Sequence, residues 1–250
     1  MDNVSYIGLS RQAALQRQMD IVANNLANVD TVGFKVEQQL LSSQAGAPAK
    51  NENVRGPALF VIDNGVGRDF SEGDLRSTGR PLDVAIEGNA FFKVQTPGGE
   101  RYTKDGRFAL NPQGQLVTAS GHPVLDAGGG TITLDPANGE PSISNDGVVS
   151  QRTPQGASTQ VGKLGVVRFD TLSVLQKGGD NLYVNTSNAT PQAANDVRLH
   201  QGMLEGSNVK PITQITNLIE IQRSYERVAQ MIQQNNDLSQ QSIDRLARVS

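Results

Sequence analysis

The distribution of glycine and proline constrains the fold of this 250-residue chain more than any other feature. Of its 26 glycines, 24 lie between Gly46 and Gly206, and so do 10 of its 11 prolines. Glycine weakens a helix through its backbone entropy, and proline through its missing N–H donor. Both ends are therefore free to form long helices, whereas the middle must consist of short segments joined by turns.

The C-terminal end carries the pattern of a long amphipathic helix. Ser207 and Asn208 are candidate N-caps, and Pro211 suits a first helical turn. A helix of about 40 residues would be about 60 Å long, more than a chain of this size needs to cover itself, so it predicts a partner. Its apolar residues alternate steps of three and four, which places them in one coiled-coil seam: Leu218, Ile221, Tyr225, Val228 and Ile232.

The N-terminal end repeats this spacing at Leu15, Met19, Val22, Leu26 and Val29. The segment 30–33 supplies a stop, since its glycine can take the left-handed conformation that ends helices. The neutral amides around these stripes suit packing against neighbouring chains. A two-heptad stripe is equally typical of a helix packed on its own domain.

The middle of the chain alternates β-prone runs with turns and predicts an antiparallel meander over 91–118. Further strand candidates are 131–134, 161–169 and 181–184, spaced as in an all-β domain. The segment 42–53 has no apolar periodicity and predicts a loop or linker. The expected fold class is therefore mixed, with a β-rich middle and a long helix at each end. Four aromatic residues are expected in the sheet core: Phe91, Phe92, Tyr102 and Phe108.

Composition excludes several function classes. The chain has no cysteine and two histidines, so disulfide scaffolds, thiol catalysis and metal sites are poor matches. A net charge of -3 gives no field for nucleic acid. No apolar run is long enough to insert into a membrane, the N-terminal helix lacks a basic polar face, and no cleavable signal opens the chain. Gly128–Gly130 leads into a strand-like run rather than a phosphate loop. We expect no cofactor, metal or nucleic acid.

One enzymatic alternative stays open on the residues alone. His122 and His200 lie near turns and are interpreted as surface residues. A hydrolase built on the β domain would instead need two facing carboxylates. The candidates are Asp63, Asp69, Glu72, Asp74 and Asp83.

Three stretches of the sequence resemble the bacterial flagellar rod and hook proteins. Residues 23–35, Ala-Asn-Asn-Leu-Ala-Asn-Val-Asp-Thr-Val-Gly-Phe-Lys, are similar to the N-terminal signature of that family. Residues 204–209, with 221–226, resemble its C-terminal signature, and residues 88–94 with 102–108 resemble its β domain. The resemblance covers nearly the whole chain. Val32 stands where many members have threonine, and the turn is retained because its glycine is kept.

The resemblance implies a non-enzymatic axial subunit of the flagellar basal body, which transmits torque from motor to hook. It implies export through the flagellar type III apparatus without a cleaved signal, and a place in the rod within the periplasm. Length and the opening residues favour the proximal rod over the alternatives, a distal-rod or hook subunit. The implied partners are other rod subunits, copies of the same chain and the export apparatus.

The resemblance also implies an architecture. The terminal helices would pair as an antiparallel coiled coil (1–35 and 207–250), followed by a connecting region (36–80 and 170–206) and an outer β domain (81–169). The ends would be disordered in the monomer. The family turn would comprise Thr31, Gly33, Phe34 and Lys35. Assembly contacts are expected at Leu15, Met19, Val22, Asn24, Asn25, Leu26, Asn28, Leu218, Ile221, Tyr225, Val228 and Ile232.

Overall fold

The structure, a computed structural model, describes residues 2–45, 59–187 and 189–247. Backbone contacts divide the chain into two compact units. The helical unit comprises Met1–Ala27, Glu37–Asp69 and Lys210–Ser250, and the β unit comprises Asn28–Val36 and Phe70–Val209. The predicted division into a terminal coiled coil, a connecting region and an outer β domain describes positions in an assembled rod. It stays a prediction.

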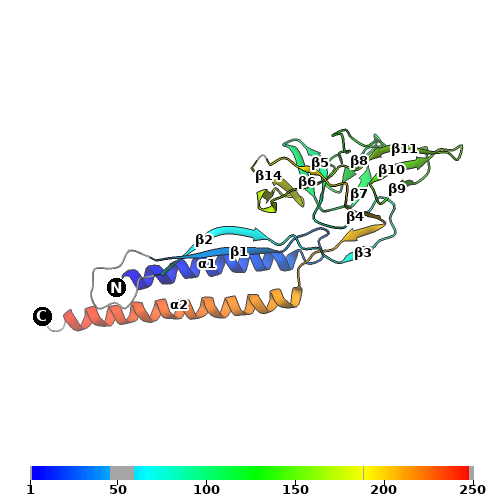
Figure 1. The fold of residues 1–250 in the computed structure, drawn as a ribbon. Coiled ribbons are helices and arrows are strands. Elements are labelled where there is room, and N and C mark those ends of the chain that lie inside the picture. The colour runs from blue at the N-terminus through cyan, green and yellow to red at the C-terminus, as the bar shows by residue number, and fades with distance from the viewer. Residues whose placement is uncertain (1, 46–58, 188, 248–250) are drawn as a thin grey trace. The chain divides into compact units, whose positions relative to one another are not determined.

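The helical unit contains the two predicted helices, α1 (Asp2–Ala27) and α2 (Pro211–Ala247). They lie side by side and run in opposite directions (Figure 1). The extension of the N-terminal stripe to Val29 is wrong, because α1 ends at Ala27. Val29 instead packs against a small apolar cluster of the β unit.

A hairpin completes the helical unit. Its strands β1 (Glu37–Ala45) and β2 (Leu59–Arg68) pair antiparallel, and both contact α1 (Figure 1). The predicted loop over 42–53 is therefore wrong for residues 42–45, which belong to β1, and its remainder lies outside the described residues. Serine, glutamine and alanine have weak β propensity, but pairing with β2 satisfies their backbone groups and decides their conformation.

The β unit is built from short antiparallel strands. One sheet has the order β13-β14-β6-β5-β12-β15, a second the order β11-β10-β9, and three further pairs are β16-β4, β17-β3 and β7-β8. A single turn of 3-10 helix spans Leu172–Val174. The strands are β3 (Leu75–Ser77), β4 (Val84–Ile86), β5 (Phe91–Thr96), β6 (Gly99–Thr103), β7 (Phe108–Leu110), β8 (Leu116–Thr118), β9 (Pro141–Ile143), β10 (Val148–Arg152), β11 (Ser158–Lys163), β12 (Val166–Arg168), β13 (Leu175–Lys177), β14 (Leu182–Asn185), β15 (Gln192–Ala193), β16 (Leu199–Gln201) and β17 (Met203–Glu205).

The prediction over 91–118 is confirmed as two antiparallel hairpins, β5-β6 and β7-β8, but the continuous meander is wrong, because the second neighbour of β6 is β14 and not β7. The candidate over 181–184 corresponds to β14, whereas 161–169 is divided between β11 and β12. That division occurs because the N–H of Gly165 donates to the carbonyl of Leu125, which turns the chain out of the ladder. The candidate over 131–134 is wrong as a strand, since it forms only isolated bridges.

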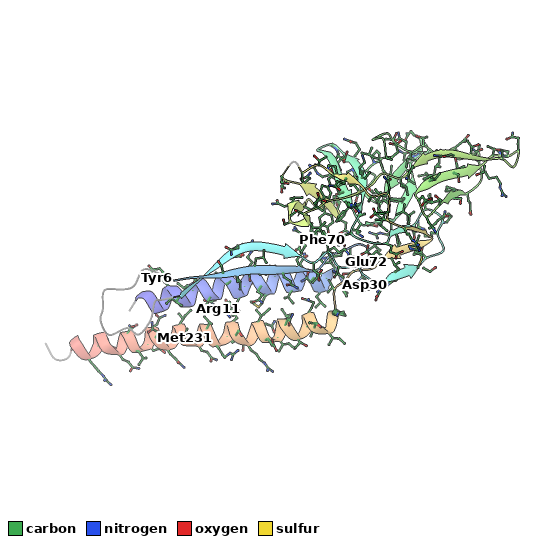
Figure 2. All side chains as sticks on the ribbon, in the orientation of Figure 1. Tyr6, Arg11, Asp30, Phe70, Glu72 and Met231 are labelled. Atoms are coloured by element: carbon green, nitrogen blue, oxygen red, sulfur yellow. The ribbon has the colours of Figure 1, made fainter. Side chains whose placement is uncertain are left out.

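Two apolar clusters form the core of the β unit. Phe92 and Phe108 belong to one, with ring centroids 4.9 Å apart. Phe91 and Tyr102 belong to the other, where the ring of Phe91 also meets that of Phe70, labelled in Figure 2. All four predicted core aromatics are buried.

Candidate assembly interface

The contact between α1 and α2 contains most of the predicted seam. Leu15, Val22 and Ile221 are buried at its centre. Four further seam residues pack against them and stay partly exposed: Met19, Leu218, Tyr225 and Val228. Leu26 is half-buried and Ile232 is half-buried. The structure therefore brings both predicted stripes together within one chain.

Glycine allows the two helices to approach each other near the start of α1. A Cβ atom built on Gly8 would lie 2.8 Å from Cγ1 of Ile232. Contacts that short do not occur between real side chains, so with any other residue at position 8 either the side chain of Ile232 or the helices would have to shift. Gly8 lies outside the stripe that predicted the interface.

The amide side chains of the N-terminal signature have different surroundings. Asn25 is 1% exposed; its Nδ2 donates to the carbonyl of Glu37 at 2.7 Å, and its Oδ1 accepts from the N–H of Glu37 at 2.9 Å. Nδ2 also lies 3.5 Å from Oε1 of Gln214 on α2. Asn24 is exposed, and Asn28 accepts a hydrogen bond from the hydroxyl of Thr31. Asn25 thus holds the start of β1 on the helix pair.

The outward faces of the helix pair carry uncovered apolar side chains. Ile212 is 81% exposed, and Leu238 is 62% exposed. Tyr6 on α1 and Met231 on α2, both labelled in Figure 2, are also exposed. The spacing of Ile212, Ile215 and Ile219 by three and four positions places them together on one face of α2.

The family turn lies in the β unit, where its residues are held by the body of that unit. Gly33 has a φ of +68°, as predicted for this stop, and its N–H donates to the carbonyl of Glu205 at 2.8 Å. Phe34 is buried against Val36 and Val209. The ammonium of Lys177 lies over the ring of Phe34, 4.3 Å from its centroid. These contacts fix the direction in which the chain leaves the turn.

Lys35 ends this turn in a buried charge network. Its Nζ donates to Oε1 of Glu205 and to the carbonyl of Ser71, both at 2.6 Å. Nζ of Lys104 lies 3.1 Å from Oε2 of Glu205 and donates to the carbonyl of Gly88. The side chains of Lys35, Lys104 and Glu205 are at most 1% exposed.

The pKa values within this network follow from burial and from its charges. Burial lowers the pKa of Lys104, as does the ammonium of Lys35, whereas Glu205 opposes the shift. Burial alone would raise the pKa of Glu205, but the two ammonium groups and the N–H of Gly73 outweigh it and hold the pKa below its ordinary value. Glu205 is therefore a carboxylate at neutral pH.

Sequence reasoning placed Lys35 in the family turn but did not identify its partners. Asn208 was predicted as a candidate helix N-cap, which is wrong: α2 begins at Pro211, and the Oδ1 of Asn208 accepts instead from the N–H of Val36 at 2.8 Å. Glu205, Asn208 and Lys104 all belong to the stretches that carry the family resemblance. The sequence offered one signal for this network: Lys104 and Glu205 are charged residues with apolar or glycine residues near them in stretches that carry the family resemblance.

Three of the five candidate carboxylates of the hydrolase alternative have described contacts, and Asp69 and Asp74 are exposed. Asp63 accepts from the N–H of Gly65 at 2.8 Å and from Nε2 of Gln39 at 3.0 Å. Glu72 accepts from the N–H of Gly88. Asp83 is 1% exposed, and its Oδ1 lies 3.9 Å from Nε of Arg80. None of these contacts presents an acid and a base across a cleft.

A surface groove on the β unit is lined by charged residues, but each acid in it already has a partner. Arg168 lies 2.7 Å from Asp196, and His200 lies 3.0 Å from Glu87. A hydrogen bond from the backbone N–H of Asp196 lowers the pKa of its carboxyl, and Arg168 lowers it further, the opposite of what a general acid needs. Within the described parts of the chain, no three histidine or carboxylate side chains group as metal ligands, and no helix is long and apolar enough to cross a membrane.

Three protein families match the chain. Residues 6–35 match "Flagella basal body rod protein", residues 85–151 match "Flagellar hook protein FlgE/F/G D1 domain", and residues 200–245 match "Flagellar basal body rod FlgEFG protein C-terminal". The first and third of these matches cover the family turn and Glu205, respectively.

Relatives that align with nearly the whole chain are also named flagellar basal-body rod proteins. The chain is 52% identical to the flagellar basal-body rod protein FlgF of Caulobacter vibrioides over 250 residues, which is 100% of both chains. It is 35% identical to FlgF of Mesorhizobium japonicum over 100% of both chains. It is 34% identical to the flagellar basal-body rod protein FlgG of Bacillus subtilis, over 96% of this chain and 97% of the relative.

Proposed function

The chain belongs to the flagellar basal-body rod protein family, and from this premise we propose that it is a subunit of the proximal rod that polymerises through its terminal helices. Members of this family are structural proteins, so the chain is not an enzyme and the hydrolase alternative is set aside. The length and the opening residues favour the proximal rod, and two relatives that align over 100% of both chains are named FlgF. The 34% identity to FlgG supports a distal-rod subunit as the second candidate.

The observation that carries the proposal is the uncovered apolar surface of α2. Ile221 is the one hydrophobic residue of this 37-residue helix that is buried among those the structure describes. Ile212 is 81% exposed. Most of the stability of a helix in a protein comes from packing of its apolar face against other elements. Neighbouring subunits in a rod supply that packing.

Assembly then uses the seam between the two helices and their outward faces together. The alternating three and four spacing of the seam supports an antiparallel coiled coil, which forms the inner part of the rod. The remaining chain is divided as the family architecture implies: a rod core (1–35 and 207–250), a connecting region (36–80 and 170–206) and an outer β domain (81–169). Torque passes from motor to hook through the core.

Folding of the helices is coupled to this assembly. Ordering the helices Asp2–Ala27 and Pro211–Ala247 costs entropy that a lone pair of half-covered helices does not recover, so the helices stay unfolded until they reach the growing rod. An unfolded end also suits passage through the type III export apparatus without a cleaved signal, into the periplasmic part of the basal body. The partners are other rod subunits and copies of this chain.

Electron microscopy of basal bodies tests the function directly. A strain that lacks this gene is expected to form rings with an absent or truncated rod and no hook, and the restored wild-type gene is the control. Complete rods, hooks and filaments in the deletion strain would contradict the proposal. A rod that stops at its distal part would favour the second candidate.

A substitution in the seam tests the proposed route of assembly. Ile221→Asp buries a charge at the centre of the helix contact and is expected to abolish hooks, as is Val228→Asp. Gln222→Asp places the same charge at an exposed neighbouring position and serves as the control. Normal swimming of both seam variants would contradict the interface. Limited proteolysis of the monomer tests coupled folding, which predicts rapid cleavage within residues 1–27 and 215–250.

A further inference from the structure

The segment Asn28–Val36, here called the arm, connects α1 to β1 but belongs to the β unit. The described hydrogen bonds that tie its turn to the rest of the chain run to the body of that unit. The N–H of Gly33 donates to the carbonyl of Glu205, and Nδ2 of Asn181 donates to the carbonyl of Val32 at 2.9 Å. None of these bonds involves either helix. The arm therefore has a source of stability that does not depend on the helical unit.

The apolar contacts of the arm also lie within the β unit. Phe34 is 2% exposed and Val36 is 8% exposed, and both pack with Val209. Asn208 reinforces this contact, since its Oδ1 accepts from the N–H of Val36 and its own N–H lies 3.4 Å from the carbonyl of Phe34. The short segment before α2 is thus tied to the arm.

The charge network makes this docking conditional on Glu205. Two ammonium groups, from Lys35 and Lys104, share the single carboxylate of Glu205 with no solvent access. Glu72, which is exposed nearby, adds only a weak attraction for Lys104. A buried ammonium without a carboxylate is strongly unfavourable, so removal of the charge on Glu205 would leave two such groups. Lys35 can escape to water by undocking the arm, whereas Lys104 lies within the body.

We propose that Lys35 and Glu205 form a latch that holds the arm and residues 207–209 in the β unit whether or not the helices are folded. In the free chain, the folded β unit then begins at Asn28 and ends at Val209. The growing rod has to order the helices but not the turns that lead into them. This consequence rests on the proposed function; the latch itself does not.

Hydrogen exchange of the purified full-length monomer tests the latch. Peptides from the arm are expected to exchange at least about 100-fold more slowly than an unstructured chain, as core peptides around Leu116 do. Glu205→Gln is expected to accelerate exchange in the arm by at least about 100-fold while the core around Leu116 stays protected. Glu140→Gln, the same change at an exposed carboxylate of the β unit, is expected to have no effect.

A second variant covers the case in which Glu205→Gln unfolds the whole unit. Lys35→Met leaves the ion pair of Lys104 and Glu205 intact and removes only the arm's side of the latch, so accelerated exchange confined to the arm is expected. Arm peptides that exchange like an unstructured chain in the wild type would overturn the latch, as would Lys35→Met without an arm-specific effect. Helices protected in the monomer would contradict coupled folding and leave the latch standing.

Discussion

Asn25 and Glu37 are joined by two hydrogen bonds, in which one side-chain amide takes the place of a neighbouring strand. Nδ2 of Asn25 donates to the carbonyl of Glu37 at 2.7 Å, and the N–H of Glu37 donates to Oδ1 of Asn25 at 2.9 Å. Only an amide of this length offers a donor and an acceptor at these two positions. The relationship gives Asn25 a structural role that a side chain with only a donor or only an acceptor cannot fill.

Asn25→Asp should therefore loosen the hairpin without changing side-chain size. The carboxylate would face the carbonyl of Glu37 with no proton to donate, and an unmet buried group costs about 2 kcal/mol. We expect faster hydrogen exchange at the start of β1 in isolated rods and fewer hooks per cell. Asn24→Asp, at an exposed neighbouring position, should leave both unchanged. Equal effects of the two variants would show that charge on α1, and not the pair of hydrogen bonds, is responsible.

Gly8 and Ile232 give a second test of the helix contact, through volume rather than charge. Gly8→Val should displace the side chain of Ile232 or force the helices apart, because its Cβ would lie 2.8 Å from Cγ1 of Ile232. Ile232→Ala removes that atom and alone should cost about 1 kcal/mol, since the side chain is half-buried. The double variant should swim better than Gly8→Val alone. If the two effects simply add, residues 8 and 232 do not touch in the rod.

The charge on Asp63 should make the docking of the hairpin on α1 sensitive to acid. A hydrogen bond from Gly65 lowers the pKa of Asp63 below its ordinary value of 3.8, and contacts from Gln39 and Arg17 lower it further. A lowered carboxyl pKa means that the contribution to stability is complete above 3.8 and is lost as the pH falls through the lower value. The protection of β2 against hydrogen exchange in isolated rods, relative to an unstructured chain at the same pH, should thus fall below about pH 4.

Asp63→Asn provides the comparison for this pH dependence. The amide keeps a hydrogen-bond acceptor but cannot titrate or pair with Arg17, so the protection of β2 should be lower at pH 6 and vary less towards pH 3. Parallel curves for the wild type and this variant would assign the acid response to other groups. Arg17→Gln, which removes the 2.9 Å ion pair alone, should give an intermediate curve.

The parts of the fold that sequence could predict depend on neighbours along the chain. The seam residues from Leu15 to Val22 and from Leu218 to Val228 were found because helical spacing is local. Strands β1 and β2 were not predicted, because the conformation of each is decided by the other, and the first residue of β2 lies 14 positions after Ala45. Burial of charge is equally non-local: Lys35 and Glu205 are 170 positions apart, and neither carries a periodic signal.

Gly33 was predicted from its stop signal alone, and the structure gives its replacement a larger cost than backbone strain. At φ +68° an L-residue is strained by about 1 kcal/mol. A Cβ at Gly33 would in addition lie 2.8 Å from the carbonyl carbon of Lys104, which is backbone and cannot rotate away. Gly33→Ala should therefore cost about 3 kcal/mol of arm docking in total.

Gly156→Ala separates these two contributions. Gly156 has a φ of +87° and no atom within 4 Å of its Cβ position, so alanine there meets the strain without the collision. Its loss of stability in thermal unfolding should stay near 1 kcal/mol. Hydrogen exchange in the arm should accelerate only in Gly33→Ala. Equal losses for the two variants would mean that the arm can retreat from Lys104 at no cost, and that its docking is looser than the contacts of Lys35 imply.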